Sequence, residues 1–132
     1  MVTMWMLKPH SYAGTTIFIF GLSAMITGLV GLTNQSVLLT HFTFEQNAGT
    51  QTLMTASSMA ALNMGLYYIV AAITEWRVFF WLTVPGRILT TYVFRRLVTT
   101  GIAPDAFLGV AMWEGIGAAL TAGGLWFDSR KI

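Results

Sequence analysis

The scarcity of charge is the feature that most constrains the fold of this chain. Asp, Glu, Lys and Arg together make up 9% of the 132 residues, whereas 55% are hydrophobic. A soluble domain carries about 25% charged residues, so this chain has too little charge to cover a water-exposed surface. The natural solvent for such a sequence is lipid, which indicates an integral membrane protein.

Four long segments carry almost no charge, and they run over residues 15–32, 53–74, 78–97 and 106–127. Each is close to the roughly 20 residues that a helix needs to cross a bilayer core of about 30 Å. The backbone must satisfy its own hydrogen bonds in lipid, and the segments lack the alternation typical of barrel strands. We therefore predict an all-α fold in which residues 1–132 form one membrane domain, an antiparallel bundle of four transmembrane helices.

The positions of Lys and Arg at the helix ends predict the orientation of the bundle. Four spans place both termini and the joint between the second and third spans on one side of the membrane. That side holds Lys8, Arg77, Arg130 and Lys131, and the other holds Arg95 and Arg96. Because positive residues are in excess on the cytoplasmic side, we expect both termini in the cytoplasm, at a bacterial inner membrane or a eukaryotic endomembrane. The first apolar run lacks a good signal-peptide cleavage site and is expected to be retained.

The third segment is interrupted by Pro85, Gly86 and Arg87, which form either a turn between two helices or part of one helix. A turn would leave only about ten apolar residues before Arg95, well short of a span. A single helix has the right length. We therefore predict one helix that is kinked at Pro85, because proline removes a backbone hydrogen bond and bends the axis.

Arg87 falls near the middle of this span, where a charged side chain costs at least about 2.5 kcal/mol and needs a partner inside the protein. Arg87 precedes Gly101, the expected turn, by 14 residues, and Glu114 follows it by 13. At about 1.5 Å per residue, both lie roughly 20 Å from the turn and therefore at the same depth. The same count across the preceding joint places Asn63 at this depth as well. The sequence thus predicts a polar layer of Asn63, Arg87 and Glu114 at the membrane centre.

Neighbouring residues extend this layer. Side chains three or four positions apart share a helix face, and small residues on such a face allow close helix packing. Small residues accompany Glu114 at Ala111, Gly117, Ala118 and Thr121. The predicted site comprises Glu114 and Arg87 as catalytic residues and, for substrate binding, Asn63, Tyr67, Thr83, Thr91 and Trp113.

Several chemistries are excluded by the composition. The chain has no cysteine, which rules out disulfides, thiol catalysis and cysteine metal sites. His10 and His41 stand apart without the spacing of metal ligands, so we expect no metal site and no cofactor. No basic patch with interleaved aromatic residues indicates nucleic-acid binding.

Three stretches carry a family resemblance: "ALNMGLYYIVAA", "FFWLTVPGRILT" and "AMWEGIGAAL". Over about residues 55 to 125 the chain resembles the DoxX-like small four-helix membrane proteins, including the BphX-type group. In that family an asparagine, a proline with an arginine, and an acid recur in the second, third and fourth helices. The matching positions here are Asn63, Pro85, Arg87 and Glu114. The resemblance implies a four-helix bundle, whereas the activities of the family are mostly obscure.

Two functions of different classes follow from the polar layer. The first is a small membrane enzyme or binding protein for an apolar small molecule, such as a terpenoid, polyketide, quinone or sterol-like compound. Acid–base isomerisation, cyclisation or hydration, typical of biosynthesis, would suit one Glu and one Arg. The second is a non-catalytic accessory subunit of a larger membrane complex or homo-oligomer, in which the pair only fixes packing. A proton-coupled exporter ranks last, because the first helix carries no acid.

Overall fold

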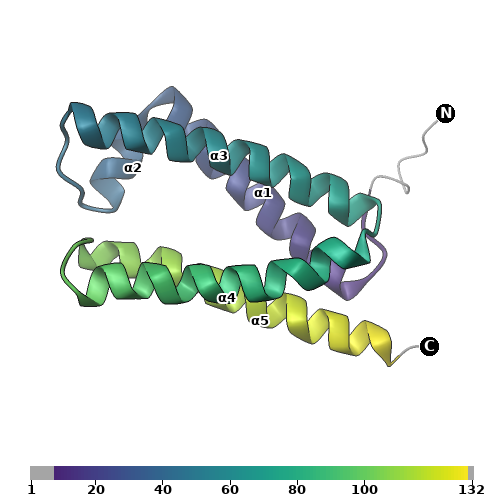
Figure 1. The fold of residues 1–132 in the computed structure, drawn as a ribbon. Helices are drawn as coiled ribbons and strands as arrows, with labels where there is room; N and C mark the ends of the chain where they lie inside the picture. Colours follow the sequence, from purple (N-terminus) through teal and green to yellow (C-terminus); the bar gives the residue numbers. More distant parts are fainter. Residues whose placement is uncertain (1–7, 131–132) are drawn as a thin grey trace.

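The structure, a computed structural model, describes residues 8–130 and is all-helical over that range (Figure 1). Lys131, one of the positive residues from which the orientation of the bundle was predicted, lies outside the described residues. The helices are α1 (Tyr12–Thr33), α2 (Gln35–His41), α3 (Ala48–Ile73), α4 (Arg77–Thr99) and α5 (Leu108–Ser129), with a short 3₁₀ helix, η2 (Asp105–Phe107), before α5.

All four predicted segments are helical, and α2 is an additional short helix in the stretch that joins the first two. Three helical segments are long and apolar enough to cross a membrane: α1, α3 and the continuous Asp105–Ser129 segment that contains α5. Helix α4 has 23 residues but is not among them. It is less apolar because it contains Arg77, Arg87, Arg95 and Arg96. The all-α class is therefore confirmed, and a fourth span remains a prediction.

Helix α4 continues through Pro85 without a break. This continuity excludes the alternative in which Pro85, Gly86 and Arg87 form a turn between two helices. Pro85 and Gly86 are exposed on the outer face of α4, whereas Arg87 is buried. One helix thus places the residue that lacks a backbone donor on the outside and directs the charge inward. A kink at Pro85 stays a prediction.

The long helices associate as two pairs, α1 with α3 and α4 with α5 (Figure 1). Helix α1 also packs against α5 and so joins the pairs. Although α3 and α4 are joined by only a few residues, they make little contact beyond that joint. In an antiparallel bundle, such a short joint would normally leave these two helices side by side. Instead they diverge, because α3 lies against α1.

Glycines explain why α3 packs on α1 rather than on α4. A Cβ atom added to Gly65 of α3 would lie 2.6 Å from the carbonyl oxygen of Gly21 and 2.8 Å from the amide nitrogen of Met25. A Cβ added to Gly28 of α1 would lie 2.7 Å from the amide nitrogen of Leu62. Such close backbone approach is possible only with small residues at the crossing, as at other membrane helix interfaces.

Two carboxylates from distant parts of the chain hold the beginning of α1. Glu75, in the joint between α3 and α4, accepts hydrogen bonds from the Ser11 amide at 2.9 Å and the Ser11 hydroxyl at 2.6 Å. Asp128, at the end of α5, accepts from the Tyr12 and Ala13 amides, each at 3.1 Å. Acidic groups suit a helix N-terminus because they pair with its free N–H groups and its positive dipole. These contacts bring the ends of α1, α3 and α5 together on one side of the molecule.

Replacing Gly65 with valine is expected to lower the free energy of unfolding in detergent by about 1–3 kcal/mol, because the new side chain overlaps the backbone of α1. Steric-trapping or SDS-titration measurements report this quantity. The control is Gly123→Ala on α5, where an added Cβ meets nothing within 4 Å. Equal stability of Gly65→Val and the parent would refute the close contact of α1 with α3.

Candidate functional site

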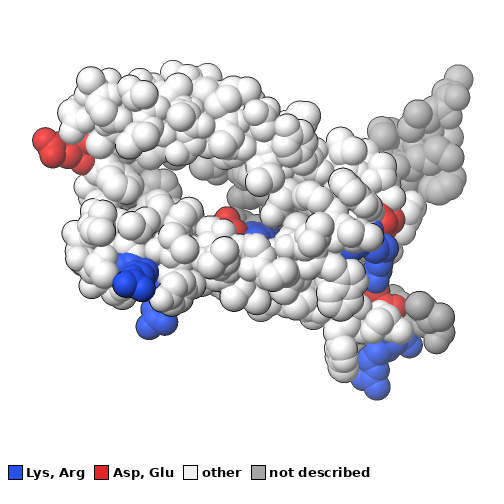
Figure 2. All heavy atoms as spheres, viewed as in Figure 1, with Lys and Arg blue, Asp and Glu red and all other residues white. Residues whose placement is uncertain are grey.

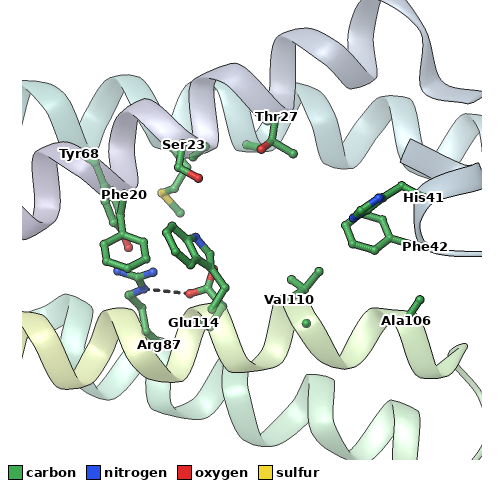
Figure 3. A pocket seen from close by; sticks show the side chains of 15 residues that line it. Phe20, Ser23, Thr27, His41, Phe42, Tyr68, Arg87, Ala106, Val110 and Glu114 are labelled. Atoms are coloured by element: carbon green, nitrogen blue, oxygen red, sulfur yellow. Dashed lines mark hydrogen bonds and ion pairs between the residues drawn. The ribbon is translucent and has the colours of Figure 1, made fainter. Parts of the chain in front are cut away.

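A cleft of about 590 Å³ lies between the α1–α3 pair and the α4–α5 pair. In the space-filling view, an opening separates the two pairs (Figure 2), and charged side chains gather mainly at the two ends of the molecule. The cleft wall is built mainly from α1, α3 and α5, with His41 and Phe42 at one end and Arg87 from α4 at the other (Figure 3). The divergence of α3 from α4 creates this space.

Arg87 and Glu114 form an ion pair in the cleft wall. The Arg87 Nε donates to Oε2 of Glu114 at 2.9 Å (Figure 3). The two side chains are unequally buried, with 6% of the Arg87 side chain and 26% of the Glu114 side chain exposed. The pairing expected from equal depth on neighbouring helices is therefore present, with the carboxylate as the member that the cleft can reach.

Aromatic rings cover the guanidinium. The Cζ atom of Arg87 lies 4.0 Å from the centroid of the Phe20 ring and 5.9 Å from that of Tyr68. A cation over an aromatic face in a desolvated setting gains about 2 kcal/mol or more. The predicted small-residue strip contributes Gly117, where a Cβ atom would overlap the guanidinium. Arg87 thus sits between a glycine of α5 and rings from α1 and α3.

The guanidinium is not fully satisfied. Nη1 of Arg87 is buried and has no hydrogen-bond partner among the described residues. Leaving a buried donor unpaired costs about 1–3 kcal/mol, and more for a charged group. The unpaired N–H group therefore offsets part of the free energy that the ion pair contributes to the packing of α4 on α5.

The other residues of the predicted site divide into two groups. Thr83 is buried and donates to the Phe80 carbonyl at 2.8 Å, and Thr91 donates to the Arg87 carbonyl at 2.8 Å. These hydroxyls satisfy backbone groups of α4, and neither residue lines the cleft. Trp113 does line it, and its ring lies 4.5 Å from that of Phe20, centroid to centroid.

Asn63 and Tyr67 do not join the polar layer. Both are exposed on the outer face of α3, with Tyr67 60% exposed, and neither lines the cleft. The count of residues from the joint addresses only the depth of Asn63 and carries no information about the direction of its side chain. The buried face of α3 is instead marked by small residues that recur every seven positions: Ser58, Gly65 and Ala72.

Most residues that line the cleft were not assigned to the site by the sequence analysis, and they include Phe20, Ser23 and Thr27 of α1 and Tyr68 of α3. A signal for the α1 residues exists in the sequence. Thr16 and the three α1 residues of the cleft follow one another at the 4-3-4 spacing of one helix face. The Thr16 hydroxyl is hydrogen-bonded to that of Thr121 of α5 at 2.8 Å, so this face points toward α5. Tyr68 follows from the small-residue face, since it lies three residues after Gly65. Side chains three apart are neighbours on a helix.

No group of three or more His, Asp or Glu side chains within residues 8–130 is arranged to hold a metal ion. Of the two histidines, His41 lines the cleft, and its ring lies 4.9 Å from that of Phe42. The polar groups of the cleft wall are therefore one carboxylate, one guanidinium, the His41 imidazole, the Trp113 indole and a few hydroxyl groups.

Comparisons with known proteins give no match: no family model, no curated protein and no solved structure is significantly similar to this chain. The resemblance to DoxX-like proteins stays a prediction.

The ion pair predicts unequal effects of single and double substitution. Glu114→Leu leaves the buried Arg87 charge without its partner and should lower the free energy of unfolding by about 3–5 kcal/mol. Combining it with Arg87→Met removes both charges, and the double variant should be as stable as the parent or more so. Unfolding in detergent, followed by circular dichroism, measures both.

The control is Arg77→Met, which breaks a more exposed ion pair with Asp128 of 3.5 Å and should cost less than about 1 kcal/mol. If the double variant is less stable than both single variants, the pair contributes to folding beyond cancelling its own charges.

Proposed function

We propose that this chain is an integral membrane protein that crosses the bilayer four times, with α4 as the least apolar span. Helix α4 runs beside α5 (Figure 1) and is long enough to cross, at 23 residues. Its central charge, Arg87, is covered by protein rather than facing outward. The resemblance to the DoxX-like bundle supports the same topology.

An even number of spans requires the start of the first helix and the end of the last helix to lie on the same side of the membrane. The Tyr12 amide at the start of α1 donates to Asp128 near the end of α5, so the first and last helices share this side. The excess of Lys and Arg on this side favours a cytoplasmic location for it. The membrane is a bacterial inner membrane or a eukaryotic endomembrane.

The function that the geometry supports best is binding and acid–base conversion of an apolar small molecule in the cleft. The observation that carries this proposal is the unequal burial of the ion pair. Arg87 is enclosed by rings and by α5, while Glu114 keeps about a quarter of its side chain open to a cleft lined mostly by apolar groups. A reactive carboxylate beside an apolar space is the arrangement that general acid–base chemistry needs.

A purely structural role explains the site less well. Replacing a buried ion pair with well-packed apolar residues is often neutral or stabilising, and this pair leaves a buried N–H of Arg87 without a partner. An intramembrane ion pair with an open carboxylate therefore indicates function. Glu114 would accept or donate a proton, and the fixed charge of Arg87 would stabilise the carboxylate or a developing negative charge on the ligand. Isomerisation, cyclisation or hydration in a biosynthetic pathway fits these two groups.

Glu114→Gln tests this proposal. The variant keeps the shape of the side chain but can neither take up nor release a proton at this position. Conversion of the pathway intermediate in native membranes should fall by about 10²–10⁴-fold. The purified variant should still fold, with a lower unfolding temperature because Arg87 loses its counter-charge. Product formation is measured by mass spectrometry of lipid extracts.

Met112→Leu, at an exposed position of the same helix, is the matched control and should keep full activity. Unchanged conversion by a folded Glu114→Gln variant would refute the acid–base role.

A second candidate function is assembly, and Asn63 is the observation that favours it. Its amide is exposed near the middle of α3 and has no hydrogen-bond partner among the described residues. An unpaired amide in an apolar medium costs roughly 2–7 kcal/mol. Exposed residues continue from it at the 4-3-4 spacing of a helix–helix contact: Ala56, Ala60, Asn63 and Tyr67.

A second copy of this chain is the partner that this face fits best. An amide both donates and accepts, so two Asn63 side chains related by a two-fold axis can satisfy each other. The alanines allow close approach of the two α3 helices. This homo-oligomer would supply the accessory, non-catalytic role within a larger assembly.

Asn63→Leu should convert the dimer to monomer in nanodiscs or mild detergent, with a dissociation constant raised about two- to twentyfold, because such membrane hydrogen bonds contribute about 0.6 and at most 1.7 kcal/mol. Single-molecule photobleaching or analytical ultracentrifugation measures the state. Thr90→Val is the control, because the Thr90 hydroxyl already donates to the Gly86 carbonyl at 3.0 Å. A parent protein that is monomeric at all concentrations would exclude this contact.

A further inference from the structure

We propose that the cleft binds a neutral, elongated lipophile with a hydroxyl head group, which donates to Glu114 and accepts from Ser23. The inference rests on the proposed function and specifies the chemistry of its ligand. Three features of the cleft carry it: the open oxygen of Glu114, the free hydroxyls of α1 opposite, and a second apolar compartment that continues from the first.

The carboxylate defines what the head group must donate. Oε2 of Glu114 accepts from Arg87 Nε, and Oε1 has no partner among the residues that the structure describes. An ionised carboxylate only accepts hydrogen bonds, so the ligand must present a donor there. Because the charge of Arg87 already balances that of Glu114, a cationic ligand would add an uncompensated charge at mid-membrane depth, and an anionic one would be repelled by the carboxylate.

The hydroxyls of α1 define what the head group must accept. Most serine and threonine hydroxyls of the described helices donate to a backbone carbonyl, and in α1 this holds for Thr15, Thr16 and Thr33. Ser23 and Thr27 are the exceptions in α1 and have no hydrogen-bond partner among residues 8–130. Both line the cleft, and Figure 3 shows them across it from Glu114 and Val110.

A hydroxyl group meets both requirements with one oxygen. It donates its proton to Glu114 and accepts from Ser23 on the opposite wall. An ether accepts but does not donate, and an ammonium donates but does not accept. The neutral alcohol or phenol is therefore the head group that leaves neither wall unpaired.

The tail is assigned by the second compartment. A further space of about 580 Å³ adjoins the first, and the two share Thr27, Phe42, Ala61 and Val110 in their walls. Apolar side chains such as Leu53, Phe94 and Phe107 surround it. From Arg87, which lines the first compartment, to Leu97, which lines the second, α4 advances about 15 Å at roughly 1.5 Å per residue. Dodecanol in an extended conformation spans this distance.

The test is competition for photolabelling of the whole chain in nanodiscs. A dodecanol that carries a diazirine near its far end labels the protein on irradiation, and peptide mapping should place the label near Leu53, Phe94 or Phe107. Unlabelled dodecanol, methyl dodecyl ether, dodecylamine and dodecanoate then compete. Dodecanol should compete at concentrations about tenfold or more below the ether, because only the alcohol makes the charge-assisted hydrogen bond to Glu114.

Three variants assign the contacts, each checked for folding by circular dichroism. Glu114→Gln should reduce the preference for dodecanol over the ether to less than about threefold, because it removes the charge assistance. Ser23→Ala should weaken the alcohol and the ether together and preserve their ratio. Val110→Phe narrows the passage to the second compartment and should weaken dodecanol while leaving competition by butanol unchanged.

The outcomes separate this inference from the proposed function. Equal competition by dodecanol and its ether overturns the hydroxyl assignment but leaves an apolar ligand in the cleft. Stronger competition by dodecylamine or dodecanoate overturns the neutral head group. Saturable labelling in the cleft that none of the four compounds reduces also overturns the inference, whereas the absence of any saturable labelling counts against the proposed function itself.

Discussion

A guanidinium near the middle of an apolar helix bundle has to be covered on every side by protein, and the structure is organised around that requirement. Arg87 receives a carboxylate and a glycine from α5, a phenylalanine face from α1 and a tyrosine from α3. All four long helices therefore contribute to one side chain. Because an apolar surrounding cannot solvate a charge, these contacts determine where the helices must approach each other.

The bundle is closed on one side of Arg87 and open on the other, and the contacts at the start of α1 account for this difference. Glycine contacts hold α1 against α3. The carboxylates of Glu75 and Asp128 bind the start of α1 and so connect the α1–α3 pair to the end of α5. At that end the helices converge and the core is buried around Ile17, Phe80 and Leu125. Toward α2 the pairs separate, and the cleft begins where the contacts of Arg87 end.

Much of this arrangement follows from the sequence, because position along a membrane helix can be counted. The count from Gly101 gives the Arg87–Glu114 pair, and the length of the third segment gives one helix through Pro85. The direction in which a side chain points from the helix axis cannot be counted in this way, and the polarity of the residue alone does not predict it. Asn63 is exposed on the outer face of α3. The face of α3 that approaches α1 is instead the one with Gly65, where any larger side chain would separate the helices. Small residues therefore predict the interior of such a bundle better than polar ones do.

The direction of Asn63 also changes how the chemistry of the site is assigned. With the amide outside, Glu114 is the one carboxylic acid among the described residues that line the cleft, and Arg87 is almost fully buried beside it. The arginine fixes the Glu114 side chain through the hydrogen bond from Nε to Oε2, while the other carboxylate oxygen stays open to the cleft. A structural ion pair has no reason to leave that oxygen uncovered, because burial of both partners would exclude solvent and strengthen their attraction. The open oxygen of Glu114 is therefore the feature on which the proposed binding site rests.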